Sequence, residues 1–275
     1  MSSASGCYGF RLEGIDAASL LVAAPAEWPA MHVGQALGAG SPPELDFVGP
    51  RHGGIVLQTG GWIELQREPA RMTFHLPGRR PDGEIVHPYL APGMSVAARW
   101  AGRETFHASA VVIAGSAWLL VGDKGDGKSS TVAWLATRGH PVLTDDLVVV
   151  DGAEAFAGPR CLDLRPDAAE QLGAGVPLGL IGGRERWRLA LDPVPPRVPL
   201  GGWFRLGWGD AVEATPIPAA QRLLALAGAR SLRVPPERPE ALVGLSALPG
   251  WELRRPREWR SIPEVAARML EIAAT

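Results

Sequence analysis

A segment in the middle of the chain has the glycine, lysine and serine spacing that binds a triphosphate. Its residues fit the pattern GxxxxGK[ST], with one further serine behind it, and they are Gly122, Asp123, Lys124, Gly125, Asp126, Gly127, Lys128, Ser129 and Ser130. Glycines let backbone amides turn toward an anion, and a helix that begins here directs its positive end at the phosphates. We expect Lys128 to reach the β- and γ-phosphates and Ser129 to bind magnesium, so ATP and Mg²⁺ are the predicted cofactors.

The lysine content of the chain favours the same interpretation. The 27 lysine and arginine residues include only two lysines, Lys124 and Lys128, and both lie in this segment. A compact ammonium is not interchangeable with a planar guanidinium at a phosphate site. The alternative is a glycine-rich turn that merely opens a helix. The apolar run before the segment and the amphipathic stretch after it favour the nucleotide site.

Two adjacent carboxylates and one histidine are candidates for the chemistry. Asp145 and Asp146 follow the apolar segment Val142–Thr144. On a strand, neighbouring side chains point to opposite sides, so one carboxylate can face a metal ion and the other an incoming hydroxyl. A solvated turn between strands is the alternative. His107 precedes the next apolar run, and a lone histidine is more often structural than catalytic.

The elements that must position these residues can be predicted from the surrounding pattern. Apolar runs at residues 108–114 and 117–121, separated by a glycine-serine turn, predict a β-hairpin that leads into the glycine-rich segment. Residues 128–138 predict a helix, with Arg138 at its negative end and Gly139 as its left-handed stop. Strands are expected at residues 141–144 and 147–150.

The flanking regions differ in character. Residues 1–103 hold short apolar stretches broken by glycine and proline clusters, which predicts a β-rich N-terminal region. Residues 104–275 are the predicted catalytic domain, with further helices at 166–172, 219–227 and 263–273. The last helix has Ser261 and Glu264 at the spacing of a capping box.

Two arginines near residue 187 share a predicted strand. Arg186 and Arg188 are two residues apart, so both point to one face. We expect this face to contact the nucleotide or acidic groups of an acceptor. A solvated edge strand is the alternative, because edge strands commonly carry such charges.

The composition narrows the class of protein. The chain has 275 residues, 46% of them hydrophobic and 20% charged, and a net charge of −2, so no strong field attracts nucleic acid or an anionic membrane. The first residues lack the pattern of a signal peptide, and no apolar run is long enough to span a bilayer. Cys7 and Cys161 lack metal or redox spacing. We expect a cytoplasmic protein without nucleic-acid or membrane partners.

Together these motifs resemble the HPr serine kinase/phosphorylase family. The resemblance extends from His107 to Val150 and is carried by Phe106-His107-Ala108, the glycine-rich segment, Thr137-Arg138-Gly139-His140 and Asp145-Asp146. It implies an α/β fold, a P-loop HPr kinase-like domain close to phosphoenolpyruvate carboxykinase, and phosphoryl transfer from ATP to a serine hydroxyl. It implies that Asp145 takes the general-base position, that Asp146 binds the metal for which the glycine-rich segment already predicts Ser129, and that His107 lies near the phosphates beside the catalytic Lys128.

The C-terminal part is similar to HPr-kinase-like proteins that accompany modified-peptide gene clusters, at residues 162–167, 184–189 and 253–257. Two features depart from the classical enzymes. Their Glu-Ile-Arg-Gly-Leu-Gly-like signature, tied to phosphorylase activity and a second acidic metal contact, is not found between residues 150 and 183. Asp126 replaces a small or aliphatic loop residue, and it should weaken triphosphate binding unless it points outward or pairs with Lys124.

These observations predict an ATP-dependent serine kinase whose partner is a peptide or small protein, such as the precursor of a lasso-type natural product. The first alternative is an HPr serine kinase/phosphorylase that regulates carbon metabolism. The second is a non-catalytic nucleotide-binding accessory protein. A small-molecule acceptor and a homo-oligomeric state stay open.

Overall fold

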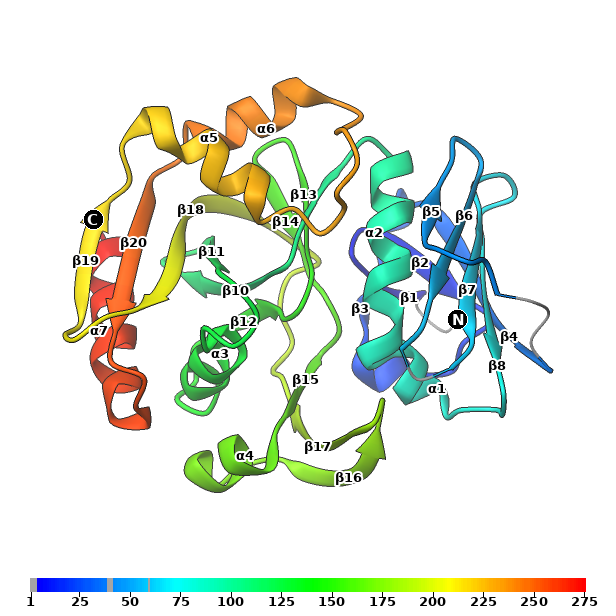
Figure 1. The fold of residues 1–275 in the computed structure, drawn as a ribbon, viewed down its shortest axis with the longest axis horizontal. Coiled ribbons are helices and arrows are strands. Elements are labelled where there is room, and N and C mark those ends of the chain that lie inside the picture. The colour runs from blue at the N-terminus through cyan, green and yellow to red at the C-terminus, as the bar shows by residue number, and fades with distance from the viewer. Residues whose placement is uncertain (1–3, 39–41, 59) are drawn as a thin grey trace.

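The computed structural model describes residues 4–38, 42–58 and 60–275, which form two large β-sheets, one small sheet and the helices that cover them (Figure 1). None of the helices in these ranges is long and apolar enough to cross a membrane.

The first large sheet is built entirely from the N-terminal region. Its eight strands lie in the order β3-β1-β2-β4-β8-β7-β6-β5. Their bounds are β1 (Ser5–Cys7), β2 (Phe10–Glu13), β3 (Val22–Ala23), β4 (Ala30–Leu37), β5 (Phe47–Val48), β6 (His52–Val56), β7 (Trp62–Gln66) and β8 (Arg71–Leu76). In β8 the apolar Met72, Phe74 and Leu76 are buried and the residues between them are not, as expected when alternate side chains of a strand face the core.

A bent helical stretch connects this sheet to the rest of the chain. It comprises α1 (Asp82–Glu84), η2 (Ile85–Tyr89) and α2 (Leu90–Trp100), and a short turn, η1 (Ala18–Leu20), lies earlier in the chain. The bend is at His87, whose φ of −150° and ψ of 122° are extended. Pro88 follows it, and a proline disfavours the helical conformation of the residue before it. Helix α2 contacts β6 and β7 on one side and β9 on the other, so it lies between the two large sheets (Figure 1).

The second large sheet carries the glycine-rich segment. Its strands follow the path β12-β10-β11-β18-β14-β13-β9, with β20 on the C-terminal half of β18 and β19 on β20. Their bounds are β9 (Glu104–Phe106), β10 (Ala108–Ile113), β11 (Ser116–Val121), β12 (Val142–Thr144), β13 (Val148–Asp151), β14 (Glu154–Phe156), β18 (Arg197–Trp208), β19 (Glu213–Pro216) and β20 (Gly250–Arg255). Strands β10 and β11 pair as the expected antiparallel hairpin, while β11, β18 and β20 run parallel.

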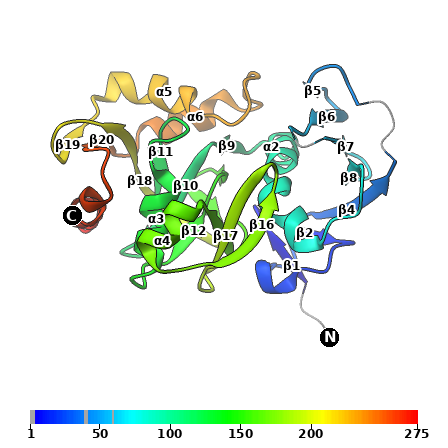
Figure 2. The same cartoon turned by 60° about the horizontal axis from the view of Figure 1, so that its bottom comes forward.

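A three-stranded sheet in the order β15-β17-β16 completes the β-structure. Its bounds are β15 (Cys161–Leu164), β16 (Val176–Ile181) and β17 (Arg184–Ala190). Strand β15 contacts η2 of the N-terminal region and also the helix that follows the glycine-rich segment. Figure 2 shows β16 and β17 extending between α4 and the N-terminal region.

The remaining helices largely occupy the predicted positions. They are α3 (Lys128–Ala136), α4 (Pro166–Leu172), α5 (Ala219–Gly228), α6 (Pro239–Ser246) and α7 (Ile262–Ala273), with a short turn η3 (Trp259–Ser261) before the last. Gly139 has the left-handed φ of 80° expected of a helix stop. Helices α2 and α6 were not predicted.

The predicted capping box at the last helix is wrong. Ser261 ends η3 with a helical φ of −82° and ψ of −17°, whereas a capping serine needs an extended backbone. Its hydroxyl donates to the carbonyls of Pro256 at 2.9 Å and Glu258 at 2.7 Å. The side chain is therefore used by the preceding turn and does not cap α7.

The hydrophobic core is continuous from the N-terminal sheet into the second sheet. Alternate residues of the β10–β11 hairpin separate two faces: Val111 and Leu120 pack with α3 and α7, while Ala110 and Leu119 belong to the cluster that also includes Tyr8. The backbone amide of Tyr8 donates to the carbonyl of Ala157 at 2.7 Å. The first strands of the chain are thus hydrogen-bonded to its middle.

Candidate functional site

The glycine-rich segment forms the tight connection between β11 and α3. Gly125 and Gly127 have φ values of 102° and 88°, which residues with a side chain rarely adopt. At Gly127 a Cβ would also lie 2.2 Å from Nη2 of Arg255. Helix α3 begins at Lys128, so the free amides of its first turn and its positive dipole end lie at this connection. Residues 123–125 are exposed at its tip.

The ammonium of Lys128 contacts the backbone of the glycine-rich segment itself. Its Nζ donates to the carbonyl of Gly122 at 2.8 Å and to that of Asp123 at 3.1 Å, and the residue is only 7% exposed. Burial lowers the pKa of Lys128, and the carboxylates of Asp145, Asp126 and Asp146 oppose that shift. A terminal phosphate at this position would replace backbone carbonyls as the partner of the ammonium.

Asp126 takes neither of the two arrangements that were expected of it. Its Oδ2 accepts the backbone N–H of Asp123 at 2.6 Å and lies beside Gly122, so it points into its own turn. In the part of the chain that the structure describes, it forms no ion pair with Lys124. Its charge acts instead on Arg255, opposing the lowering of the arginine pKa by burial. This explains how an acid is accommodated in the segment.

Asp145 is a buried carboxylate directed at the start of α3. It follows β12 and is 4% exposed. Its Oδ1 accepts a hydrogen bond from the Ser109 hydroxyl, and a second from the Ser129 hydroxyl at 3.2 Å. Burial raises the pKa of Asp145, as does the neighbouring charge of Asp146, while the hydrogen bond from Ser109, the charge of His87 and the hydrogen bond from Ser129 lower it.

Asp146 occupies a turn beside this buried group. It has a left-handed φ of 65° and is half-buried. Its carbonyl lies 3.1 Å from Nδ1 of His107, and since a carbonyl can only accept, this ring nitrogen is the donor. His107 itself is exposed. Ser129 is hydrogen-bonded to Asp145, although it was expected to bind the metal together with Asp146.

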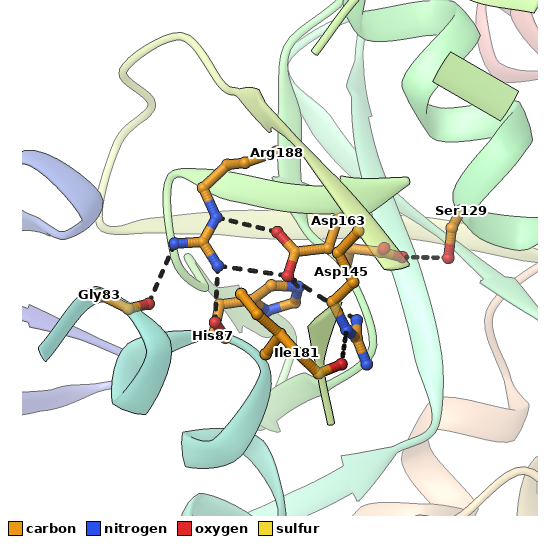
Figure 3. A network of polar contacts seen from close by, with 8 residues as sticks. Gly83, His87, Ser129, Asp145, Asp163, Ile181 and Arg188 are labelled. Carbon is orange, nitrogen blue, oxygen red and sulfur yellow. Dashed lines mark hydrogen bonds and ion pairs between the residues drawn. The ribbon is translucent and has the colours of Figure 1, made fainter. Parts of the chain in front are cut away.

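The two arginines of β17 have different surroundings. Arg188 donates from Nε and Nη2 to the Asp163 carboxylate at 2.9 and 3.2 Å. Its Nη1 donates to the carbonyl of Gly83 at 3.1 Å, and its Nη2 also donates to that of His87 at 2.6 Å. Within the ranges that the structure describes, the single hydrogen bond of Arg186 goes to the carbonyl of Ile181, at 3.1 Å, and its Nη1 lies 3.8 Å from Asp163. Both side chains approach Asp163 and so share one face, as predicted, but Arg188 is already engaged by the four hydrogen bonds named above (Figure 3).

Three residues of this region were missed in the sequence. Ser109 and Asp163 are polar residues inside otherwise apolar strands. A polar residue among apolar neighbours is a signal that could have identified them. The side chain of Asp163 is 0% exposed. His87 carries no such local signal, because it lies at an irregular bend 76 residues before Asp163 in the chain.

The donor atoms fit a nucleotide-bound Mg²⁺ better than a resident metal ion. No group of three or more His, Cys, Asp or Glu side chains in the described ranges is arranged to hold a metal by itself. A serine hydroxyl beside one carboxylate oxygen supplies hard oxygen ligands, and Mg²⁺ commonly binds through one or two carboxylates together with substrate phosphates and water. Ser129 and Asp145 are such a pair.

Comparison with known proteins gives limited results. No family model matches the chain, and no curated protein matches its sequence. Solved structures with a similar chain include the Hpr(Ser) kinase/phosphatase from Coxiella burnetii, with 14% sequence identity and a TM-score of 0.33 over 62% of this chain and 98% of that chain.

Proposed function

We propose that this chain is an ATP- and Mg²⁺-dependent serine kinase of the HPr kinase-like type, with a peptide as its acceptor. The observation that carries the proposal is the contact of Ser129 with the buried Asp145 at the start of α3, where Lys128 also lies. A hydroxyl, a carboxylate and an ammonium at the end of a glycine-rich turn are the groups that hold Mg²⁺ and the β- and γ-phosphates in P-loop proteins.

The reaction moves one phosphoryl group. The serine oxygen of the acceptor forms a bond to the γ-phosphorus, the bond from that phosphorus to the β–γ bridging oxygen breaks, and ADP leaves with the electron pair. The hydroxyl proton passes to a carboxylate. Bound Mg²⁺ supplies positive charge at the phosphate oxygens. Lys128 and the first amides of α3 hold the same oxygens, and most of the catalysis comes from this positioning and charge.

The two aspartates divide the metal and proton roles. The resemblance gives the base to Asp145 and the metal to Asp146. The hydrogen bond from Ser129 favours Asp145 as the metal-side carboxylate instead. Asp146 is more exposed and lies at a turn, where an incoming hydroxyl has access. We therefore propose Asp145 for the metal side and Asp146 for the proton, with His107 fixing the Asp146 turn through its carbonyl.

An extended peptide is the acceptor that the surface supports best. Strand β16 is the edge of the three-stranded sheet, and its Val176 and Leu180 are 65% and 76% exposed. A peptide can pair with such an edge through its main chain while apolar side chains add contact area. The C-terminal similarity to proteins of modified-peptide clusters makes a lasso-type precursor the specific candidate.

The test is intact-mass analysis after incubation with ATP and Mg²⁺. Serine-containing precursor peptides and purified HPr protein are presented side by side, with Lys128→Ala as the inactive control. The proposal predicts an added phosphate on a peptide serine with the native chain only. Efficient transfer to HPr, reversed by inorganic phosphate, would identify a regulatory HPr kinase/phosphorylase instead. ATP binding without transfer to either acceptor would identify an accessory protein.

A further inference from the structure

A histidine of the N-terminal region is buried beside the candidate site. The His87 side chain is 3% exposed, and its Nε2 lies 3.9 Å from Oδ2 of Asp163. Its charge also acts on Asp145, lowering the pKa of that carboxyl against the effect of burial. An imidazole from one part of the chain thus lies beside one buried carboxylate of another part, Asp163, and its charge acts on a second, Asp145.

The backbone at His87 is fixed by the catalytic part of the chain. Arg188 donates to the carbonyls of Gly83 and His87 while both its Nε and Nη2 bind Asp163, as Figure 3 shows. The helical stretch is interrupted between these two contacts and the rest of α2, because the backbone at His87 is extended. The bend therefore has a definite partner, and it holds the imidazole at a set place.

The strand that carries Asp163 connects this histidine to the glycine-rich segment. β15 contacts η2, which carries His87, and it contacts α3, which carries Ser129. Ser129 in turn donates to Asp145. Strand β15, which carries Asp163, therefore lies between the N-terminal bend and the helix that carries Ser129.

We propose that His87 is a positioning residue of the nucleotide site, which holds the buried carboxylates so that Asp145 meets Ser129 at the metal side. The N-terminal region then contributes to the site rather than only adjoining it. This inference rests on the proposed function, because it requires that Mg²⁺–nucleotide binds at Ser129. His87 acts through Asp163 and Asp145 and touches no phosphate itself.

The test measures how much Mg²⁺ strengthens ADP binding. Calorimetric titrations with ADP, in excess Mg²⁺ and in chelator, give this ratio of affinities for the native chain and for His87→Gln. We expect the ratio to fall by about tenfold in the variant, equivalent to about 1.4 kcal/mol, while ADP affinity in chelator stays unchanged. The matched control is His75→Gln, since His75 is also in the N-terminal region and pairs with Glu64 at 3.1 Å, away from the site; its ratio should match the native chain.

A second variant covers the case in which His87→Gln does not fold. Asp163→Asn keeps the shape of the side chain but removes the charge that faces the imidazole, and it should lower the Mg²⁺ ratio in the same direction. An unchanged ratio in a folded His87→Gln, or an equal loss of ADP affinity with and without Mg²⁺, overturns the positioning role. A native chain that binds no ADP overturns the proposed function and this inference with it.

Discussion

Replacing Arg188 with glutamine should cost more stability than any surface arginine replacement, because it removes the main partner of a fully buried carboxylate. The Asp163 side chain is 0% exposed and receives two bonds from Arg188, at 2.9 and 3.2 Å. After the substitution, the contacts that Asp163 keeps among the described residues are the longer ones, from Arg186 at 3.8 Å and His87 at 3.9 Å. The carbonyls of Gly83 and His87, which accept hydrogen bonds from Arg188, also lose this donor.

The size of the effect follows from these contacts. Removing one partner of a buried ion pair costs on the order of 3–5 kcal/mol. The Arg186 guanidinium and the His87 imidazole stay within 4 Å of Asp163, so we expect the lower end, about 3 kcal/mol. With a shift of roughly 2–4 °C per kcal/mol for a protein of this size, the midpoint of thermal unfolding should fall by about 6–12 °C.

Urea and thermal unfolding of Arg188→Gln, Asp163→Asn and the double variant measure this directly. The double variant should lose less stability than the sum of the single variants, because the second substitution removes a charge that the first left uncompensated. Arg197→Gln is the control: its pair with Glu154 spans 3.4 Å with both side chains more than 40% exposed, and such pairs contribute about 0–1 kcal/mol. If Arg188→Gln lost no more stability than Arg197→Gln, or if the cycle showed no coupling, the buried contact would not hold the two parts together as described.

Three further predictions concern the nucleotide site. Lys128→Ala should abolish measurable ATP affinity in a calorimetric titration, since this ammonium is the cation at the terminal phosphates; native affinity would contradict the P-loop assignment. Asp145→Asn should weaken Mg²⁺-dependent ADP binding, whereas Asp146→Asn should leave binding nearly intact and slow turnover by about a hundredfold or more; the opposite pattern would restore the roles given by the family resemblance. Burial raises the pKa of Asp145, so the nucleotide-free folded state favours the protonated carboxyl. The free energy of unfolding of the native chain is therefore higher at low pH, and this contribution is lost as the pH rises through the raised pKa. Asp145→Asn should therefore gain thermal stability relative to the native chain as the pH rises above the ordinary range of a free carboxyl, and a difference that does not change with pH would contradict the raised pKa.

The parts of the site that sequence reasoning found are local in the chain. The turn at Gly127, the hairpin before it and the helix after it are set by residues within a few positions of one another, so glycine placement and apolar periodicity are sufficient to predict them. The capping box failed because Ser261 belongs to a preceding turn that the four-residue pattern does not reveal. The contact of Arg188 with Gly83 joins residues 105 positions apart, and no pattern in one strand identifies a backbone carbonyl on another part of the chain. The same limit explains why His87 was missed.

The hydrogen bond between Tyr8 and Ala157 has a consequence for how the chain folds during its synthesis. The backbone amide and the buried ring of Tyr8 lack their native partners until the ribosome has synthesised residue 157 and the strands around it. Until then the first sheet exposes part of an apolar face, which is the kind of surface that aggregates or recruits chaperones. Pairing over such separations also requires closing a long loop before any contact is gained, which slows folding. Expression at lower temperature or with added chaperones should therefore raise the yield of folded protein more than it would for a chain whose N-terminal part folds alone.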